Sequence, residues 1–260
     1  MICLFGPPTD RRDHIARALG GDVLLTDKVN EIVHDANDIT ICVQARDIIP
    51  NPRPRHVFVL HDSLLPAFRG CATLAWQILE GREEFGVTLI EAADCVDAGP
   101  IIASAKISAD KTPANNYDRI YDRLTPLYVD LVVQNADSLV LGTYKATPQD
   151  KTAASYGSRR TPADSVIDPS RMDQRTAVRT IRASSARFGF PALLAKLPQC
   201  GAFGGREIVG YKDDTATPLL HGHPATHRRT SDDGAVFIFA DGVCRELYFA
   251  PATACTKVRP

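Results

Sequence analysis

Residues 57–70 read VFVLHDSLLPAFRG, so that an apolar segment runs directly into a loop bearing a histidine, a hydroxyl and an arginine. In α/β enzymes a buried parallel strand ends in this way, and the side chains beyond its carboxyl end face a crevice. His61 at this boundary is either a group that transfers protons or a residue that only caps the strand through a hydrogen bond. The stretch therefore predicts an α/β fold and leaves both roles of His61 open.

The composition predicts a folded chain in a reducing environment. Its 260 residues are 44% hydrophobic and carry a net charge of −1, which suits one large domain or two unequal ones. No apolar run is long enough to span a bilayer, and the first residues lack the basic flank of a signal peptide. Seven scattered cysteines without a C-x-x-C spacing argue against a disulfide framework. We therefore expect a cytoplasmic protein with no membrane partner.

Strands and helices alternate along the first half of the chain. Apolar runs predict strands at residues 2–5, 23–25, 39–43, 57–60, 86–90 and 101–107. Helical periodicity and capping residues predict helices at residues 10–19, 29–34, 73–79 and 115–141. This alternation is typical of an α/β fold with a doubly wound, mostly parallel sheet, whose ligand lies at the carboxyl ends of the strands.

Turn-prone polar residues become frequent from about residue 143, and a second unit follows them. We predict a first domain over residues 1–147, a linker over 148–165 and a small β-rich domain over 166–260. The expected elements of the second domain are a helix at 173–184 and strands at 206–212, 235–240 and 245–249. Between residues 151 and 230 there are 13 Lys and Arg against 6 Asp and Glu, an excess of 7. This excess is either a solvated basic face or a contact with phosphate or another polyanion.

Several segments, taken in order along the chain, together resemble the folate-dependent formyltransferases. They are HDSLLPAFRG at 61–70, Trp76, GVT at 86–88, DAGPII at 97–102, SRRTP at 158–162, Asp164, ID at 167–168 and IRA at 181–183. That family includes methionyl-tRNA, glycinamide ribonucleotide and sugar-amine formyltransferases. Its pattern is Asn-x-His-Pro-Ser-Leu-Leu-Pro with an Arg-Gly or Lys-Gly, followed later by Asp-Thr-Gly. The resemblance implies a formyltransferase-like catalytic first domain and an OB-like second domain.

The resemblance also implies a reaction, in which a one-carbon group moves from N10-formyltetrahydrofolate or a related folate to an amine. Acyl transfer of this kind needs a hydrogen-bond donor for the oxyanion and a base for the attacking amine. His61 is expected to transfer the proton, and Asp97 is expected to orient the imidazole. The alternative for Asp97 is an Asx-type turn before Gly99.

Further residues receive supporting roles by position in the same pattern. Auxiliary catalytic roles fall to Gln44, Asp62 and Ser63, and substrate binding falls to Arg69, Gly70 and Trp76. Folate contacts are expected from Ile49, Pro50, Ile90, Ala92 and Asp94. The competing interpretations are an ion pair for Arg69 that holds its loop, helix packing for Trp76, and ordinary strand ends for the folate set. No metal site is expected, because His221, His223 and His227 have no acidic or cysteine ligands at a suitable spacing.

Two positions depart from the family pattern. Val59 stands where the family has Asn, and Asp62 stands where it has Pro. Valine cannot donate a hydrogen bond to an oxyanion, and the loss of such a donor costs about 10²–10³ in turnover. Three explanations remain open: Gln44 replaces the amide, a formimidoyl group is transferred instead, or catalysis has been lost and the chain only binds a ligand. The chain is also shorter ahead of His61 than is usual in the family, where more residues pack the pterin.

These observations predict a transferase of formyl groups that acts on the amine of a small metabolite, such as an amino sugar or an amino-bearing natural product. The alternatives are a formimidoyl transferase, a methionyl-tRNA formyltransferase and a catalytically silent ligand-binding homologue. A nucleic-acid partner is disfavoured because the chain is short and nearly neutral. A homodimer is compatible with the prediction, and the sequence leaves the acceptor and the oligomeric state open.

Overall fold

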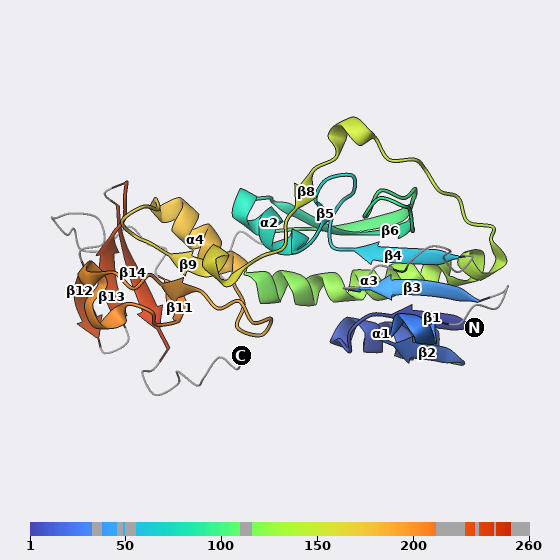
Figure 1. Cartoon of the computed structure of the whole chain (residues 1–260), viewed down its shortest axis with the longest axis horizontal. Coiled ribbons are helices and arrows are strands. Elements are labelled where there is room, and N and C mark those ends of the chain that lie inside the picture. Colours follow the sequence, from blue (N-terminus) through green and yellow to red (C-terminus); the bar gives the residue numbers. More distant parts are fainter. Residues whose placement is uncertain are drawn as a thin grey trace. The chain divides into compact units, whose positions relative to one another are not determined.

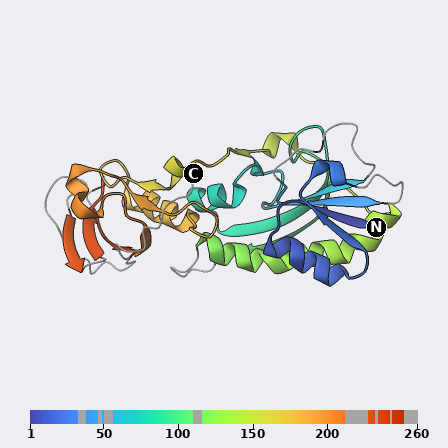
Figure 2. The same cartoon turned by 60° about the horizontal axis from the view of Figure 1, so that its bottom comes forward.

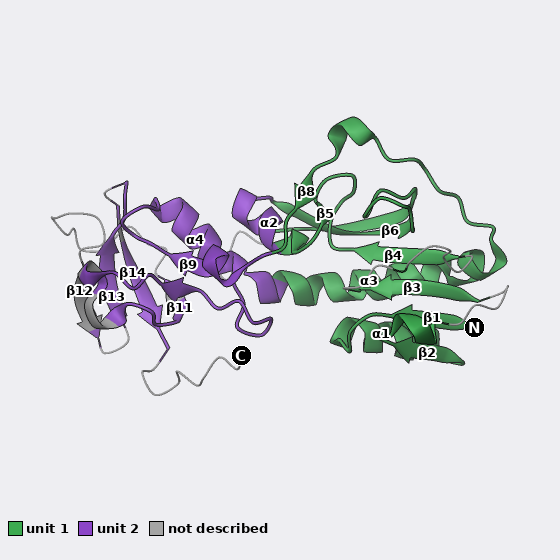
Figure 3. Cartoon of the chain, viewed as in Figure 1, with its two compact units in different colours: residues 1–74, 83–109, 120–159 green, residues 75–82, 110–119, 160–260 purple. Residues whose placement is uncertain are grey.

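The computed structural model (Figure 1) describes residues 1–32, 38–45, 49, 56–109, 116–211, 227–231, 234–241 and 243–250. The chain forms two compact units (Figure 3). The first unit comprises residues 1–74, 83–109 and 120–159, and the second comprises residues 75–82, 110–119 and 160–260. The chain crosses between the units after Arg159, within the segment predicted as a linker. The domain boundaries proposed from the sequence stay a prediction.

A six-stranded sheet in the order β2-β1-β3-β4-β6-β7 forms the centre of the first unit. Its strands are β1 (Ile2–Phe5), β2 (Val23–Thr26), β3 (Ile39–Val43), β4 (Val57–His61), β6 (Glu84–Glu91) and β7 (Ile101–Ser108). The first four strands pair in parallel, while β6 pairs antiparallel with both β4 and β7. A loop and no crossover helix joins β6 to β7, and a connection of this kind permits only antiparallel pairing. The predicted doubly wound, mostly parallel sheet is confirmed, with one antiparallel hairpin at its edge.

The helical elements of this part of the chain are α1 (Asp10–Leu19), η1 (Val29–Glu31), α2 (Thr73–Glu80) and α3 (Tyr117–Leu141). Most of α2 belongs to the second compact unit, and most of α3 belongs to the first. Thr9 caps α1 by accepting a hydrogen bond from the amide of Arg12, and Gly20, with φ 62°, ends the helix. The helices α1 and α3 lie side by side along the sheet (Figure 2). In the described part of the chain no helix is both long and apolar enough to cross a membrane.

A short pair of parallel strands links the loop after β4 to a distant segment. β5 (Arg69–Gly70) pairs with β8 (Tyr156–Gly157), which follows the 3-10 turn η2 (Lys151–Ala153). The amide of Arg69 donates to the carbonyl of Ser155, and the amide of Phe68 donates to the Ser155 hydroxyl. Part of the predicted linker is therefore folded onto the loop that carries His61, within the first unit.

The second unit contains a four-stranded antiparallel sheet in the order β11-β14-β13-β12. Its strands are β11 (Ile208–Tyr211), β12 (His227–Ser231), β13 (Gly234–Ile238) and β14 (Cys244–Phe249). The remaining elements are η3 (Pro162–Ser165), β9 (Val166–Ile167), α4 (Gln174–Ala183), β10 (Leu193–Leu194) and η4 (Pro198–Phe203). Phe203, Phe237 and Phe249 pack together in its core. The predicted β-rich C-terminal region and its helix are confirmed, and β12 is an addition to the predicted strands.

Candidate active site

His61 ends β4, and Gln44 follows β3 at the same carboxyl edge of the sheet. Val43 pairs with Leu60 in parallel register, so the next residue of each strand emerges at a neighbouring position. Because successive side chains of a strand point to opposite faces, His61 shares its face with Val59. The carboxyl edge predicted to hold the site thus brings together His61, Gln44 and the position where the family pattern has its asparagine.

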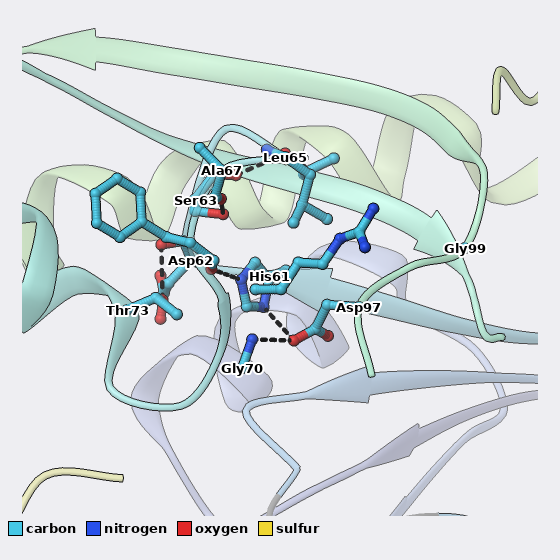
Figure 4. A network of polar contacts seen from close by, with 12 residues as sticks. His61, Asp62, Ser63, Leu65, Ala67, Gly70, Thr73, Asp97 and Gly99 are labelled. Carbon is cyan, nitrogen blue, oxygen red and sulfur yellow. Dashed lines mark hydrogen bonds and ion pairs between the residues drawn. The ribbon is translucent and has the colours of Figure 1, made fainter. Parts of the chain in front are cut away.

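The imidazole of His61 is buried between two oxygen acceptors (Figure 4). Its Nε2 lies 2.6 Å from the carbonyl oxygen of Phe68, and its Nδ1 lies 3.3 Å from Oδ2 of Asp97. A carbonyl oxygen can only accept, so Nε2 carries a proton and donates it. A neutral ring with that proton turns its Nδ1 lone pair toward a carboxylate, whereas the imidazolium donates to both acceptors. The ring is therefore held by its Nε2 on the Phe68 carbonyl, with Nδ1 facing the carboxylate of Asp97.

The backbone of the Asp97 loop approaches β6 closely. Asp97 has φ 52°, a left-handed conformation that aspartate tolerates better than most residues. A Cβ on Gly99 would stand 1.7 Å from the carbonyl oxygen of Glu91, so only glycine fits there. The amide of Gly70 donates to Oδ2 of Asp97 at 2.8 Å. The loop thus presents one carboxylate oxygen to both His61 and the β5 backbone.

Arg69 is buried, and two neutral groups hold its guanidinium. Its Nε and Nη2 donate to Oε1 of Gln149 at 3.1 and 2.7 Å, and its Nη1 donates to the Tyr156 hydroxyl at 3.1 Å. The side-chain amide of Gln149 in turn donates to the carbonyls of Asp97 and Gly99 at 2.9 and 2.6 Å. Arg69 therefore supports the loops around the imidazole through an uncharged network.

Asp62 forms an ion pair with a fully buried arginine. Nη1 of Arg11 lies 2.6 Å from Oδ1 of Asp62, and the guanidinium carbon lies 3.6 Å from the ring centroid of Tyr121 and 4.2 Å from that of Tyr128. Burial acts to lower the pKa of Arg11, but Asp62 and the two tyrosines outweigh it, so this pKa is raised. Burial, first, and the charge of Asp62 raise the pKa of Tyr128 well above its usual value. Asp62 thus has a structural partner that the sequence did not indicate.

Ser63 and Gln44, both given auxiliary roles from the sequence, differ in their surroundings. Ser63 is fully buried and its hydroxyl donates to the carbonyl of Ala67 at 2.7 Å, which fixes the loop. Gln44 is half-buried with φ 53°, and its Oε1 accepts from the Tyr121 hydroxyl at 3.1 Å. Within the described ranges its amide nitrogen makes no hydrogen bond. Gln44 therefore offers a donor at the edge where His61 lies.

The residues predicted to contact folate fall partly on one apolar surface. Ile49, Phe5 and Val57 belong to a buried cluster that also includes Ile32 and Cys42, and Val59 and Ala92 pack against it. Ile90 pairs with Val59 across β4 and β6. Asp94 is exposed in the loop after β6, and Pro50 lies outside the described residues. Trp76 lies on α2 within the second compact unit.

The histidines weighed as metal ligands are only partly described. His221 and His223 lie outside the described residues, and His227 begins β12. In the described ranges no three His, Cys, Asp or Glu side chains gather as metal ligands would.

Comparison with known proteins identifies the segment that contains His61 and Asp97. Residues 25–134 match the family model described as formyl transferase. Over these residues the chain is similar to the formyl transferase family. A methionyl-tRNA formyltransferase of Halorhodospira halophila is 31% identical over 173 residues, which make up 66% of this chain and 54% of the relative. The chain thus spans about half the length of this curated formyl transferase.

Solved structures of other proteins share the fold. HypX from Aquifex aeolicus in complex with tetrahydrofolic acid has a TM-score of 0.69 at 20% identity, covering 95% of this chain and 43% of that one. An N-formyltransferase from Helicobacter canadensis in complex with folinic acid and dTDP-3-aminofucose has a TM-score of 0.68 at 14% identity, covering 96% and 99%. These likenesses show the fold of this chain.

Sequence reasoning missed three residues around the candidate site: Arg11, Gln149 and Tyr156. Arg11 lies on an amphipathic helix whose other arginines suggest a solvated face, and the other two lie in a segment with the composition of a linker. Their contacts bridge 51 residues from Arg11 to Asp62 and 80 residues from Arg69 to Gln149. No local pattern could have indicated them.

Proposed function

We propose that this chain transfers a formyl group from N10-formyltetrahydrofolate to the amine of a small metabolite such as an amino sugar. The observation that supports this proposal most is the His61–Asp97 pair at the carboxyl end of β4, inside the segment that matches the formyl transferase family model. The Helicobacter canadensis structure, whose ligands are a folate and a nucleotide-linked amino sugar, supports both substrate classes. A chain with this function is a one-carbon transferase.

The sheet face beside His61 has the chemistry that the folate donor requires. Val59 and Ala92 are partly exposed and pack against the buried cluster of Ile49, Phe5 and Val57, so they would give a flat ring an apolar contact. Ile49, Ile90 and Ala92 would hold the pterin, with Pro50 and Asp94 as the further contacts. The bound folate supplies the activated formyl group.

The chain's own groups then divide the work of acyl transfer. Nε2 of His61 donates its proton to the Phe68 carbonyl in a hydrogen bond, so the proton of the attacking amine is exchanged at Nδ1. Asp97, beside Nδ1, balances the positive charge that the ring then carries. The side-chain amide N–H of Gln44 donates to the oxygen that gains negative charge, in place of the amide that Val59 cannot supply. Arg69 and Gly70 hold the part of the loop after β4 that would face the amine substrate.

Replacing Gln44 by methionine is expected to lower kcat by about 10²–10³, because the oxyanion loses its side-chain donor while the volume is kept. Val59→Asn in the same chain is expected to restore part of the loss, since residue 59 lies on the face of β4 that carries His61. Steady-state kinetics of the single and double variants measure both effects. Gln134→Met on the exposed side of α3 is the matched control. An unchanged kcat in Gln44→Met excludes Gln44 as the donor.

Methionyl-tRNA formylation is the second candidate, and the 31% identity to the Halorhodospira halophila enzyme favours it. The valine at position 59, where the family pattern has asparagine, leaves two further candidates: a formimidoyl transferase and a catalytically silent homologue. The transferases predict different products from the same enzyme sample, and the silent homologue predicts none.

The test is mass spectrometry of reactions that pair formyl- and formimino-tetrahydrofolate with a panel of amines, including a dTDP-linked amino sugar and charged initiator methionyl-tRNA. We expect a formyl gain on the amino sugar. A formyl gain on methionyl-tRNA alone would establish the second candidate, and a formimidoyl gain would change the transferred group. The absence of product with every pair would contradict an enzymatic role.

A further inference from the structure

Gln149 uses its whole hydrogen-bonding capacity between two loops. A side-chain amide has one oxygen with two lone pairs and one nitrogen with two protons. Oε1 of Gln149 accepts twice from Arg69, and Nε2 donates to the carbonyls of Asp97 and Gly99. The inverse orientation would set the amide nitrogen against a guanidinium and the oxygen against two carbonyls. The geometry therefore admits one orientation of this side chain.

The two loops that Gln149 joins both contribute to the position of the Asp97 carboxylate. Arg69 belongs to β5, whose next residue, Gly70, donates its amide to Oδ2 of Asp97 at 2.8 Å. The same carboxylate oxygen faces Nδ1 of His61 at 3.3 Å. Fixing the backbone carbonyl of Asp97 relative to Arg69 thus fixes where the carboxylate meets the imidazole.

The Asp97 loop has little apolar packing to hold it in place. Asp94, Cys95 and Val96 are exposed, and the side chain of Val96 is 52% accessible to solvent. Hydrogen bonds therefore help to fix the position of the loop. Those donated by Gln149 reach the first and last residues of the Asp97–Gly99 turn. In a loop with such exposed residues, the loss of two hydrogen bonds shifts the population of conformations.

Gln149 itself is anchored by backbone pairing. Thr147 and Ile101 exchange two backbone hydrogen bonds of 2.8 Å, which fixes the chain beside the end of the Asp97 loop. Gln149 lies outside residues 25–134, which match the family model, and inside the segment whose composition predicted a linker. Its side chain is therefore delivered to the site from beyond the matched segment.

We propose that Gln149 is a positioning residue that keeps the carboxylate of Asp97 on Nδ1 of His61 by tying the Asp97–Gly99 turn to Arg69. The assignment rests on the proposed function for its effect on catalysis. Gln149 touches no reacting atom and acts through Asp97.

Two substitutions distinguish the hydrogen bonds that Gln149 accepts from Arg69 from those that it donates to Asp97 and Gly99. Gln149→Glu keeps an acceptor for Arg69 but removes both donors and turns an oxygen toward the two carbonyls. Gln149→Leu removes both sets of hydrogen bonds at similar volume. Gln134→Glu on the exposed side of α3 is the matched control for an added charge.

The first measurement is amide hydrogen exchange of Gly70, which reports the contact with Asp97 and requires no turnover. We expect exchange about 10- to 100-fold faster in Gln149→Glu and Gln149→Leu than in the wild type, from the loss of two hydrogen bonds. The amide of Ile41 in the buried strand β3 should exchange at its wild-type rate. Unchanged exchange at Gly70, or equal acceleration at Ile41, would overturn the positioning role.

The second measurement is steady-state kinetics with the substrate pair found by the product screen. We expect kcat to fall about 10- to 100-fold in Gln149→Glu with KM for the acceptor unchanged, because the tie acts on the proton-transferring pair and not on binding. A rise in KM alone would contradict the assignment. If the wild type forms no product, the proposed function fails while the exchange of Gly70 still decides whether Gln149 positions Asp97.

Discussion

Replacing Asp62 by leucine is expected to lower the free energy of unfolding by about 3–5 kcal/mol, because it leaves the charge of Arg11 buried without its partner. The guanidinium of Arg11 is fully buried, and its Nη1 lies 2.6 Å from Oδ1 of Asp62. It also contacts the faces of Tyr121 and Tyr128, the carbonyl of Tyr121 and the hydroxyl of Thr125, none of which carries a full negative charge. Arg11→Met should cost less, since Asp62 keeps some contact with water.

The double variant Arg11→Met/Asp62→Leu should recover much of this loss, since a buried ion pair is often replaced by apolar side chains at little cost. Urea unfolding followed by circular dichroism measures all three variants. Asp137→Leu, at an exposed position of α3, is the control for adding an apolar side chain. If Asp62→Leu lowers the free energy of unfolding by less than about 1 kcal/mol, the pair contributes no more than an exposed salt bridge does. That result would contradict the effect expected from its burial.

The ion pair between Arg11 and Asp62 also explains why residue 62 departs from the family pattern. Asp62 stands where the family pattern has proline, and its partner comes from α1, 51 residues earlier. On a helix with several arginines, nothing local distinguishes Arg11 from the exposed Arg17. Sequence reasoning could therefore find the unusual residue but not the interaction that explains it.

The regular elements were predictable because hydrophobic periodicity is local. The strands at residues 2–5 and 39–43 agree with β1 and β3 residue for residue, and the long helix starts within two residues of its prediction. The antiparallel hairpin β6–β7 follows from a connection without a helix, but its register depends on the pairing of both strands. Periodicity thus predicts elements better than their pairing.

The candidate site was predictable where it is contiguous. The loop from His61 to Gly70 stands out because it follows a buried strand, and Asp97 was found through the resemblance. Gln149 was missed because a glutamine in a turn-rich segment is indistinguishable from a solvated residue until the fold brings it to Arg69. Distance along the chain therefore limited what sequence reasoning could find.

Replacing His61 by glutamine is expected to lower kcat by about 10²–10⁴, the range that a positioned proton-transferring group contributes. Glutamine keeps a donor for the Phe68 carbonyl, which His61 contacts at 2.6 Å, so the loop should stay folded. The readout is kcat with the substrate pair from the product screen, and thermal unfolding checks integrity. His14→Gln on the exposed side of α1 is the matched control.

Asp97→Asn tests the other half of the pair and should lower kcat by a similar factor. Asparagine tolerates the left-handed backbone that Asp97 adopts at φ 52°, and its oxygen can still accept from the Gly70 amide. Only the negative charge that balances the imidazolium is lost. Because the two groups act as one unit, the double variant should be little worse than either single variant. Multiplicative losses, or full activity in Asp97→Asn, would show that His61 works without this carboxylate.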